Sequence, residues 1–268
     1  MSVATQSLSV ERLFDISGRS ALVTGATGAL GGAVARALVA SGAKVTLAGG
    51  GADSLEELGS ELRSQGGEVE LVARRPSSPE DTDAMVEAAV SAHGRLDFLF
   101  TAAGENRPAK IEQQDPADWQ AVIDANVRGT WLACRSAGRR MIEQGDGGRV
   151  VLVSSTRGKL GLAAGYSAYC TSKAAVDGLT RTLACEWGPH GIAVNAVAPA
   201  LFRSPLTAWM YGDEPRGVAA REGMLGRTPL GRLAEPEDMV GTVLYLLSPG
   251  AAFVTGQIVY VDGGYTAG

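Results

Sequence analysis

The stretch Ala21-Leu22-Val23-Thr24-Gly25-Ala26-Thr27-Gly28-Ala29-Leu30-Gly31 joins an apolar run to a glycine-rich turn. A helical pattern covers residues 33–40, and a second β-like run covers residues 44–48. Glycines at a strand-to-helix turn let the backbone approach a pyrophosphate, and the helix N-terminus supplies N–H donors. The spacing is G-x-x-G-x-x-G rather than the simple G-x-G-x-x-G. We expect a dinucleotide site rather than a merely structural turn, with cofactor contacts at Gly25, Thr27, Gly28, Leu30 and Gly31.

The same alternation continues along the whole chain. Strand candidates lie at residues 21–24, 44–48, 69–73, 98–101, 149–154, 192–197 and 258–261. Helical patterns lie near residues 30–41, 53–65, 79–93, 116–144, 167–188 and 235–247. Such alternation indicates βαβ units and a parallel sheet covered on both faces. We therefore predict a single α/β domain of the Rossmann-type, doubly wound kind.

Composition excludes several classes of function. The chain has 268 residues, of which 45% are hydrophobic, and a net charge of -5, which is unlike the basic footprint of a nucleic-acid binder. Its three cysteines are scattered and lack metal-ligand spacing, so they indicate buried thiols in a reducing compartment. With only two histidines, a zinc site or a Ser-His-Asp triad has little material, and we expect no metal.

The ends of the chain and one internal segment stand apart from the βα pattern. Residues 1–13 are expected to form an N-terminal arm without a secretory signal, and residues 14–268 the catalytic domain. No run is long and apolar enough for a membrane span, so we expect a cytoplasmic protein. Residues 200–232 follow a strand and mix apolar residues with turn formers. This segment is either a substrate loop presenting Trp209, Met210 and Tyr211, or a short helix packed on the body by the same three residues.

The end of the second strand lacks the expected charge. A carboxylate there would hydrogen-bond the adenosine ribose of NAD, but the chain has Ala48-Gly49-Gly50-Gly51. Arg74 and Arg75 end the third run, close to where adenine should lie, and arginine matches phosphate geometry well. We expect cofactor contacts at Gly49, Gly50 and Arg74 and favour NADP(H) over NAD(H). A solvated surface pair is the alternative for the two arginines.

Tyr169 and Lys173 lie four residues apart, on one face of a predicted helix. Free tyrosine has a pKa of about 10, and a neighbouring ammonium favours the phenolate and lowers that pKa. The pair is therefore a candidate proton-transfer device at a hydroxyl or carbonyl. A half-buried tyrosine beside a solvated lysine is the alternative.

These motifs, taken in order, resemble the short-chain dehydrogenase/reductase family over residues 17–264. The resemblance rests on Thr24-Gly25, Thr101-Ala102-Ala103-Gly104, Asn126-Val127-x-Gly129, Ser154-Ser155, Tyr169-x-x-x-Lys173, Asn195-Ala196-Val197-Ala198-Pro199 and Val261-Asp262-Gly263-Gly264. The lead-in at residues 13–18 and the segment at residues 201–206 look like the branch with gluconate 5-dehydrogenase-like and 3-oxoacyl reductase-like enzymes.

The resemblance implies a seven-stranded sheet, NAD(P)-linked oxidoreduction and a catalytic set of Asn126, Ser155, Tyr169 and Lys173. In this family the tyrosine transfers the proton, the serine orients the substrate oxygen, the lysine lowers the tyrosine pKa and binds nicotinamide ribose, and the asparagine holds a connecting water. The expected substrate is a small alcohol or carbonyl compound of the sugar acid, polyol or 3-oxoacyl type. Further implied cofactor contacts are Ala103, Gly104, Tyr169, Lys173, Pro199, Ala200, Leu201 and Ser204.

The chain departs from the family pattern mainly at the adenosine end. Ala29 replaces a usual glycine, and Thr101-Ala102 stands where Asn-Asn is usual. Thr156 falls at the usual count before the tyrosine, although the pattern Ser155-x-x-Gly158 favours Ser155. A catalytically weak nucleotide-sensing or scaffold protein is therefore the alternative function. The family also suggests a homotetramer or dimer, with Trp131 and Cys134 as interface or buried residues.

Overall fold

The strand Ser20–Thr24 (β1) is buried along its whole length and lies near the middle of the sheet in a computed structural model that describes residues 9–268. The seven strands are all parallel and run in the order β3-β2-β1-β4-β5-β6-β7. The others are β2 (Lys44–Ala48), β3 (Val69–Val72), β4 (Phe98–Thr101), β5 (Gly148–Val153), β6 (Ile192–Pro199) and β7 (Ile258–Val261). The predicted doubly wound sheet is confirmed, and the strand order reverses between β1 and β4, where such folds bind ligands.

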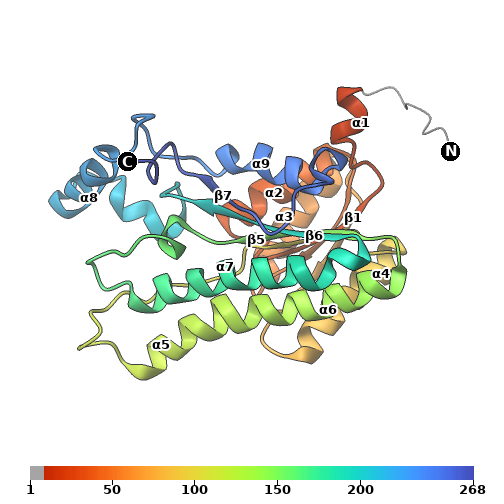
Figure 1. Cartoon of the computed structure of the whole chain (residues 1–268), viewed down its shortest axis with the longest axis horizontal. Helices are drawn as coiled ribbons and strands as arrows, with labels where there is room; N and C mark the ends of the chain where they lie inside the picture. Colours follow the sequence, from red (N-terminus) through yellow and green to blue (C-terminus); the bar gives the residue numbers. More distant parts are fainter. Residues whose placement is uncertain (1–8) are drawn as a thin grey trace.

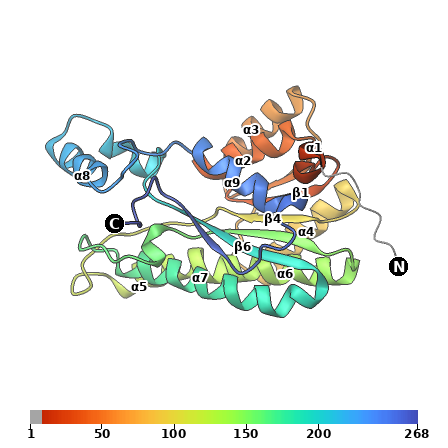
Figure 2. The same cartoon turned by 45° about the horizontal axis from the view of Figure 1, so that its top comes forward.

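Helices cover both faces of the sheet. Figures 1 and 2 show α2, α3 and α9 on one side and α4, α6 and α7 on the other, with α8 projecting beyond one end. Their bounds are α1 (Val10–Phe14), α2 (Ala29–Ala40), α3 (Ala52–Ser64), α4 (Pro79–His93), α5 (Pro116–Ile123), α6 (Gly129–Gln144), α7 (Ser167–Trp187), α8 (Pro215–Leu225) and α9 (Glu237–Leu247). Short helical turns are η1 (Asp124–Arg128), η2 (Thr156–Gly158), η3 (Gly188–His190), η4 (Pro205–Met210) and η5 (Pro249–Ala251).

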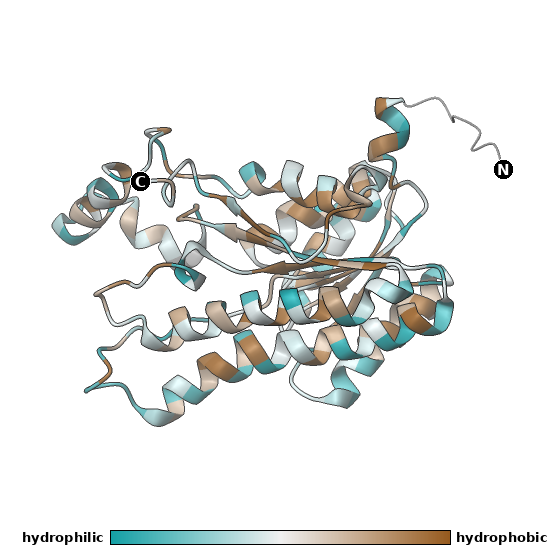
Figure 3. Ribbon diagram, in the orientation of Figure 1, coloured by the Kyte–Doolittle hydropathy of each residue, from teal (hydrophilic) through white to brown (hydrophobic). Residues whose placement is uncertain are grey.

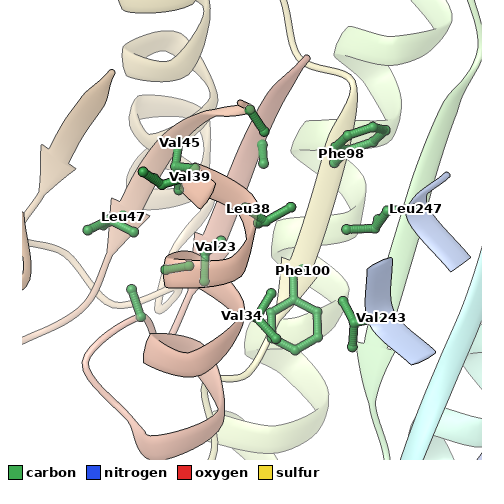
Figure 4. Close-up of a cluster of buried hydrophobic side chains, with 14 of the residues drawn as sticks. Val23, Val34, Leu38, Val39, Val45, Leu47, Phe98, Phe100, Val243 and Leu247 are labelled. Carbon is green, nitrogen blue, oxygen red and sulfur yellow. The ribbon is translucent and has the colours of Figure 1, made fainter. Parts of the chain in front are cut away.

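Two apolar clusters hold these layers together, one on each face of the sheet. In the first, Leu38 of α2 lies among side chains of the central strands (Figure 4). Val243 of α9 lies beside Phe100 of β4, and Leu247 lies between Phe98 and Phe100. The strands are hydrophobic on both faces, as expected where helices cover both sides, whereas the outer faces of the helices are more polar (Figure 3). This packing fixes the carboxyl ends of the strands, where the candidate site lies.

The long helix predicted over residues 116–144 is interrupted. It consists of α5 and α6 joined by the π-helical turn η1, in which the N–H of Gly129 bonds to the carbonyl of Asp124. Asn126 lies within this wider turn, and its side chain hydrogen-bonds the backbone of Glu105 in the segment after β4. The helical pattern of apolar residues continues through this turn in the sequence. The pattern therefore could not predict the interruption. Such π-turns occur frequently at functional sites.

The predicted N-terminal arm falls largely on residues 1–8, which lie outside the described part of the chain. Within the described part, Ser9 caps α1 by accepting a hydrogen bond from the Arg12 N–H at 3.3 Å. The ring of Phe14 lies 6.4 Å from that of Tyr245, so α1 contacts the α9 side of the domain. No helix within residues 9–268 is long and apolar enough to cross a bilayer.

Candidate cofactor cleft and active site

The glycine turn after β1 brings two strand ends into direct backbone contact. Gly25 has a φ of +66°, and a side chain there would lie 2.6 Å from the carbonyl carbon of Ala102 and meet the Ala103 backbone. Gly31 is equally constrained, because its Cβ would be placed against the Gly25 carbonyl. The turn therefore needs both glycines, the first for its left-handed φ and both for the close approach.

The same turn leaves its polar groups accessible at the start of α2. Thr27 and Gly28 are exposed, and Gly28 precedes the helix without a side-chain cap. Leu30 differs, because its side chain is buried in the core and offers only its backbone to a ligand. Exposed N–H groups at an uncapped helix N-terminus suit a pyrophosphate. The dinucleotide contacts predicted at this turn thus lie at an accessible, uncapped helix start.

Arg75, and not Arg74, lies at the glycines that follow β2. A side chain at Gly50 would meet the Arg75 guanidinium, with its Cβ 3.0 Å from Cγ. Arg74 instead forms an ion pair with Asp81 at 2.9 Å. Gly49 lies close to Thr27, whose Oγ1 would be 3.6 Å from a Cβ added at Gly49. Gly49, Gly50 and the Arg75 side chain thus lie together where the adenosine end of the cleft is predicted, while Arg74 pairs with Asp81.

Asn126 connects the end of β4 to α7. Its amide accepts a hydrogen bond from the Glu105 N–H at 2.8 Å and donates to the Glu105 carbonyl at 2.9 Å. It also donates to the Ser172 hydroxyl at 2.9 Å. Gly104 lies between this amide and the catalytic lysine candidate, because its Cβ would be 2.9 Å from Asn126 Oδ1 and 4.0 Å from Lys173 Nζ. The side chain of Asn126 thus positions the loop at residues 104–105 and does not itself contact the Lys173 ammonium.

Ser155, rather than Ser154 or Thr156, acts on the pKa of Tyr169. Its side chain partly offsets the rise in the pKa of the tyrosine that burial causes. Ser155 Oγ also accepts the Arg157 N–H at 3.1 Å, which fixes it in the turn after β5. Ser154 donates instead to the buried carboxylate of Asp177. Ser155 therefore stays the predicted partner of Tyr169.

Lys173 is held under the tyrosine by the end of β5. Its Nζ lies 5.5 Å from the centre of the Tyr169 ring and donates to the Val153 carbonyl at 2.8 Å. Burial lowers the pKa of Lys173 to about 8, while the charge of Asp177 acts in the opposite direction. The solvated-lysine alternative is excluded, because only 6% of this residue is exposed.

The pKa of Tyr169 differs from the sequence-based expectation. Burial raises it to about 12, and the Ser155 side chain and the positive charge of Arg157 offset only part of this rise. The ring is half-buried, and Tyr166 packs edge-on against it at 6.1 Å. Desolvation thus outweighs the effect that the neighbouring ammonium was expected to have.

The end of β6 carries the remaining predicted cofactor contacts. Ala200 and Leu201 follow Pro199 and line a cavity of about 230 Å³ beneath the loop 200–232, together with Thr228, Asp238 and Val261. Ser204 lies 3.1 Å from the Thr207 hydroxyl, and its N–H donates to that hydroxyl at 2.9 Å. Its side chain therefore helps to start η4 and shares its oxygen with Thr207.

The three large residues of the proposed substrate loop do not behave alike. Met210 is buried and packs on the domain, whereas 44% of Trp209 is exposed. The Arg203 guanidinium lies 3.9 Å from the centre of the Tyr211 ring. The loop thus combines both interpretations of its sequence: one residue anchors it and one remains available at the surface.

Two residues that the sequence did not single out lie beside this site. Arg157 is 9% exposed, and its Nη2 donates to the Tyr265 hydroxyl at 3.0 Å. Tyr265 is itself only 2% exposed, although it is close to the end of the chain. The only sequence signal for Arg157 is its place two residues after Ser155. In the described residues, 9–268, no group of three or more His, Cys, Asp or Glu side chains is placed to hold a metal.

The fold and the cleft define a Rossmann-type enzyme that uses a dinucleotide for oxidation and reduction. The family model described as enoyl-(acyl carrier protein) reductase matches residues 25–266. The chain accordingly belongs to the short-chain dehydrogenase/reductase family, as its motifs had indicated. It is therefore an NAD(P)-dependent oxidoreductase.

Individual relatives cover almost the whole chain. An uncharacterized oxidoreductase of Mycobacterium tuberculosis (strain ATCC 25618 / H37Rv) is 56% identical over 95% of this chain and 93% of its own. D-threitol dehydrogenase of Mycolicibacterium smegmatis is 35% identical over 97% of this chain and 98% of its own. The structure of a gluconate 5-dehydrogenase from Burkholderia cenocepacia J2315 in complex with NADP and tartrate matches with a TM-score of 0.91, at 27% identity, over 97% of this chain and all of its own.

Proposed function

We propose that this chain transfers a hydride between a nicotinamide cofactor and a small polar alcohol or carbonyl compound, with Tyr169 as the acid and base. The observation that carries this proposal is the placement of Tyr169: the Ser155 side chain acts on its pKa, and the Lys173 ammonium lies 5.5 Å from its ring centre. A proton at the Tyr169 hydroxyl and a donor at Ser155 suit a substrate oxygen that gains or loses charge.

The protein's own residues divide this work. Ser155 Oγ holds the substrate oxygen next to the tyrosine hydroxyl, which gives up or takes the proton. Lys173 supplies positive charge close to that phenol, and its lowered pKa of about 8 makes it able to release a proton near neutral pH. Asn126 positions the loop that carries Gly104 beside the lysine. The bound nicotinamide supplies the hydride chemistry.

The cofactor that we propose is NADP(H). Two observations support it: no carboxylate stands at Gly49–Gly51 to reject a 2′-phosphate, and the Arg75 guanidinium lies at Gly50. The Burkholderia relative was found with NADP. The glycine turn fits the pyrophosphate, since its N–H groups lie at the exposed start of α2.

A polyol or sugar acid is the substrate type that we propose. One relative is named for D-threitol and another for gluconate, both small and polyhydroxylated compounds.

We also propose a homotetramer or dimer that uses the outer face of α6 and α7. In support, Trp131 is 49% exposed there and lies in a groove with Cys134 and Trp187. Light scattering of the purified chain would test the assembly.

The decisive experiment replaces Tyr169 with Phe and compares it with Tyr166→Phe, its ring neighbour. General acid–base catalysis contributes about 10²–10⁴-fold, so Tyr169→Phe should lower kcat by about that factor while the Kd of NADPH stays unchanged. Tyr166→Phe should retain kcat within a few-fold. A Tyr169→Phe variant with near wild-type turnover would refute the proposal. If the folded wild type binds neither NADPH nor NADH in calorimetry, a scaffold protein becomes the better interpretation.

A further inference from the structure

Arg157 is a nearly buried cation with no acidic partner. Its Nη1 donates to the Gly161 carbonyl at 3.1 Å, and its Nη2 donates to the Tyr265 hydroxyl at 3.0 Å. Both partners are neutral. Within residues 9–268, no carboxylate lies within 4.0 Å of its guanidinium. Most of the ion-paired arginines of this chain are more exposed, for example Arg74 with 53% of its side chain exposed.

A second cation shares the same aromatic neighbour. The guanidinium of Arg227, on the loop 200–232, lies 4.6 Å from the centre of the Tyr265 ring, and that of Arg157 lies 5.4 Å from it. Arg227 also forms no ion pair in the described part of the chain. The nearby carboxylate of Asp262 instead accepts hydrogen bonds from Gly264 and Thr266. Two positive charges therefore flank one ring without neutralisation.

Arg157 belongs to the turn that holds Ser155. Its backbone N–H bonds to Ser155 Oγ at 3.1 Å, and the positive charge of its guanidinium acts on Tyr169 and on Cys170. A buried charge without a counter-charge is costly, and buried charges in proteins are usually paired. Guanidinium groups bind carboxylates through paired, charge-assisted hydrogen bonds. The missing partner should therefore arrive with the substrate.

We propose that the substrate carries a carboxylate and that Arg157, assisted by Arg227, binds it while the reacting hydroxyl or carbonyl faces Ser155 and Tyr169. This inference rests on the proposed function and narrows it to hydroxy acids and their oxo acids. Neutral polyols lack the group that would pair with Arg157. The guanidinium thus selects acids over alditols of the same carbon skeleton and fixes which carbon reaches the tyrosine.

Tartrate and threitol test the inference, because they share a four-carbon skeleton. Tartrate ends in carboxylates, whereas threitol ends in hydroxymethyl groups. Their binding to the NADPH-loaded protein is measured by calorimetry for the wild type, Arg157→Gln, Arg157→Lys and Arg149→Gln. Arg149 is a half-buried arginine at the opposite end of β5 and serves as the matched control. The wild type should bind tartrate at least tenfold more tightly than threitol.

Arg157→Gln should weaken the binding of tartrate by about 10–100-fold, as expected for the loss of a charge-assisted hydrogen bond. The binding of threitol should stay unchanged. Arg157→Lys should retain part of the preference, and Arg149→Gln all of it. A variant counts as folded when its thermal unfolding and its NADPH affinity are unchanged. If Arg157→Gln fails this check, the comparison is made with Arg157→Lys and Arg227→Gln. Equal wild-type binding of the two compounds, or equal weakening of both by the substitutions, overturns the inference.

Turnover separates this inference from the proposed function. If the wild type oxidises neutral polyols but no hydroxy acid, hydride transfer stands and the carboxylate site is refuted. If tartrate binding depends on Arg157 but no alcohol or carbonyl compound is turned over, the carboxylate site stands and the proposed function fails.

Discussion

Lys173 donates a hydrogen bond through its ammonium to the Val153 carbonyl at 2.8 Å, which ties α7 to the carboxyl end of β5 by a buried charge. Burial lowers the pKa of this lysine to about 8 from 10.5. Below pH 8 the folded state must hold the charge in a poorly solvated place, so the ammonium destabilises the fold there. Between pH 8 and 10.5 the unfolded chain binds a proton that the folded chain lacks, and this contribution becomes less unfavourable as the pH rises.

We therefore expect Lys173→Met to lose activity without losing stability. The pKa shift corresponds to roughly 3 kcal/mol, and the lost hydrogen bond offsets about 1 kcal/mol of that. At pH 7 the free energy of unfolding should rise by up to about 2 kcal/mol, and the gain should shrink near pH 10. Urea unfolding at both pH values measures it. A variant destabilised equally at both would contradict the assignment of a strained buried charge.

The pH dependence of turnover should follow Lys173 rather than Tyr169. The tyrosine pKa of about 12 lies beyond the usual assay range, whereas the lysine pKa of about 8 lies within it. Because the charge of Asp177 raises the lysine pKa, Asp177→Asn should move the midpoint of the kcat/KM profile below that of the wild type. Glu87→Gln, on the exposed face of α4, is the control and should leave it in place. A midpoint that shifts upward would show that another group controls the profile.

Arg75→Ala should weaken NADPH and spare NADH. The guanidinium lies at Gly50, and losing one charge-assisted phosphate contact corresponds to about 10–100-fold in Kd. Arg74→Ala is the matched control: its guanidinium is engaged with Asp81, so the NADPH affinity should change by less than a few-fold. Fluorescence titration with both cofactors gives the four constants. If Arg74→Ala has the larger effect, the adenosine end has been assigned to the wrong arginine.

Gly25→Ala should disrupt the cleft. A methyl group there would lie 2.6–2.7 Å from backbone atoms of Ala102 and Ala103, and the left-handed conformation adds about 1–2 kcal/mol. We expect a loss of several kcal/mol of stability, with little cofactor binding in any folded remainder. Gly161→Ala, with no atom within 4 Å of its Cβ, should remain close to wild type in thermal unfolding. A stable Gly25→Ala protein would mean that the β1–β4 contact is looser than described.

The sequence predicted the sheet well because its strands are short, apolar and separated by clear helical periods. The seven strands form where expected, and the glycine turn lies at the switch point. It could not predict the π-turn around Asn126, because the hydrogen bonds to Glu105 and Ser172 that accompany it come from segments far along the chain.

Two neighbouring arginines show a second limit of prediction from the sequence. Arg74 and Arg75 follow the end of β3, where the regular alternation of side chains has stopped, so spacing does not reveal which one faces Gly50. Arg157 shows the same limit in another form. Its burial depends on Tyr265, more than a hundred residues away, and no local pattern reports that contact.

The glycines after β2 also bear on how this enzyme can evolve. Every glycine codon becomes an aspartate or glutamate codon by one nucleotide change. At Gly50 that change would place a carboxylate where we propose that the adenosine ribose binds, and it would displace the Arg75 guanidinium. Tyr169 and Lys173 lie on α7, and Lys173 is held by the end of β5. The substitution at Gly50 would therefore not change their positions. With the cofactor bound as we propose, a single mutational step would move a lineage from one pool of reducing equivalents to another, while the chemistry at the substrate stays the same.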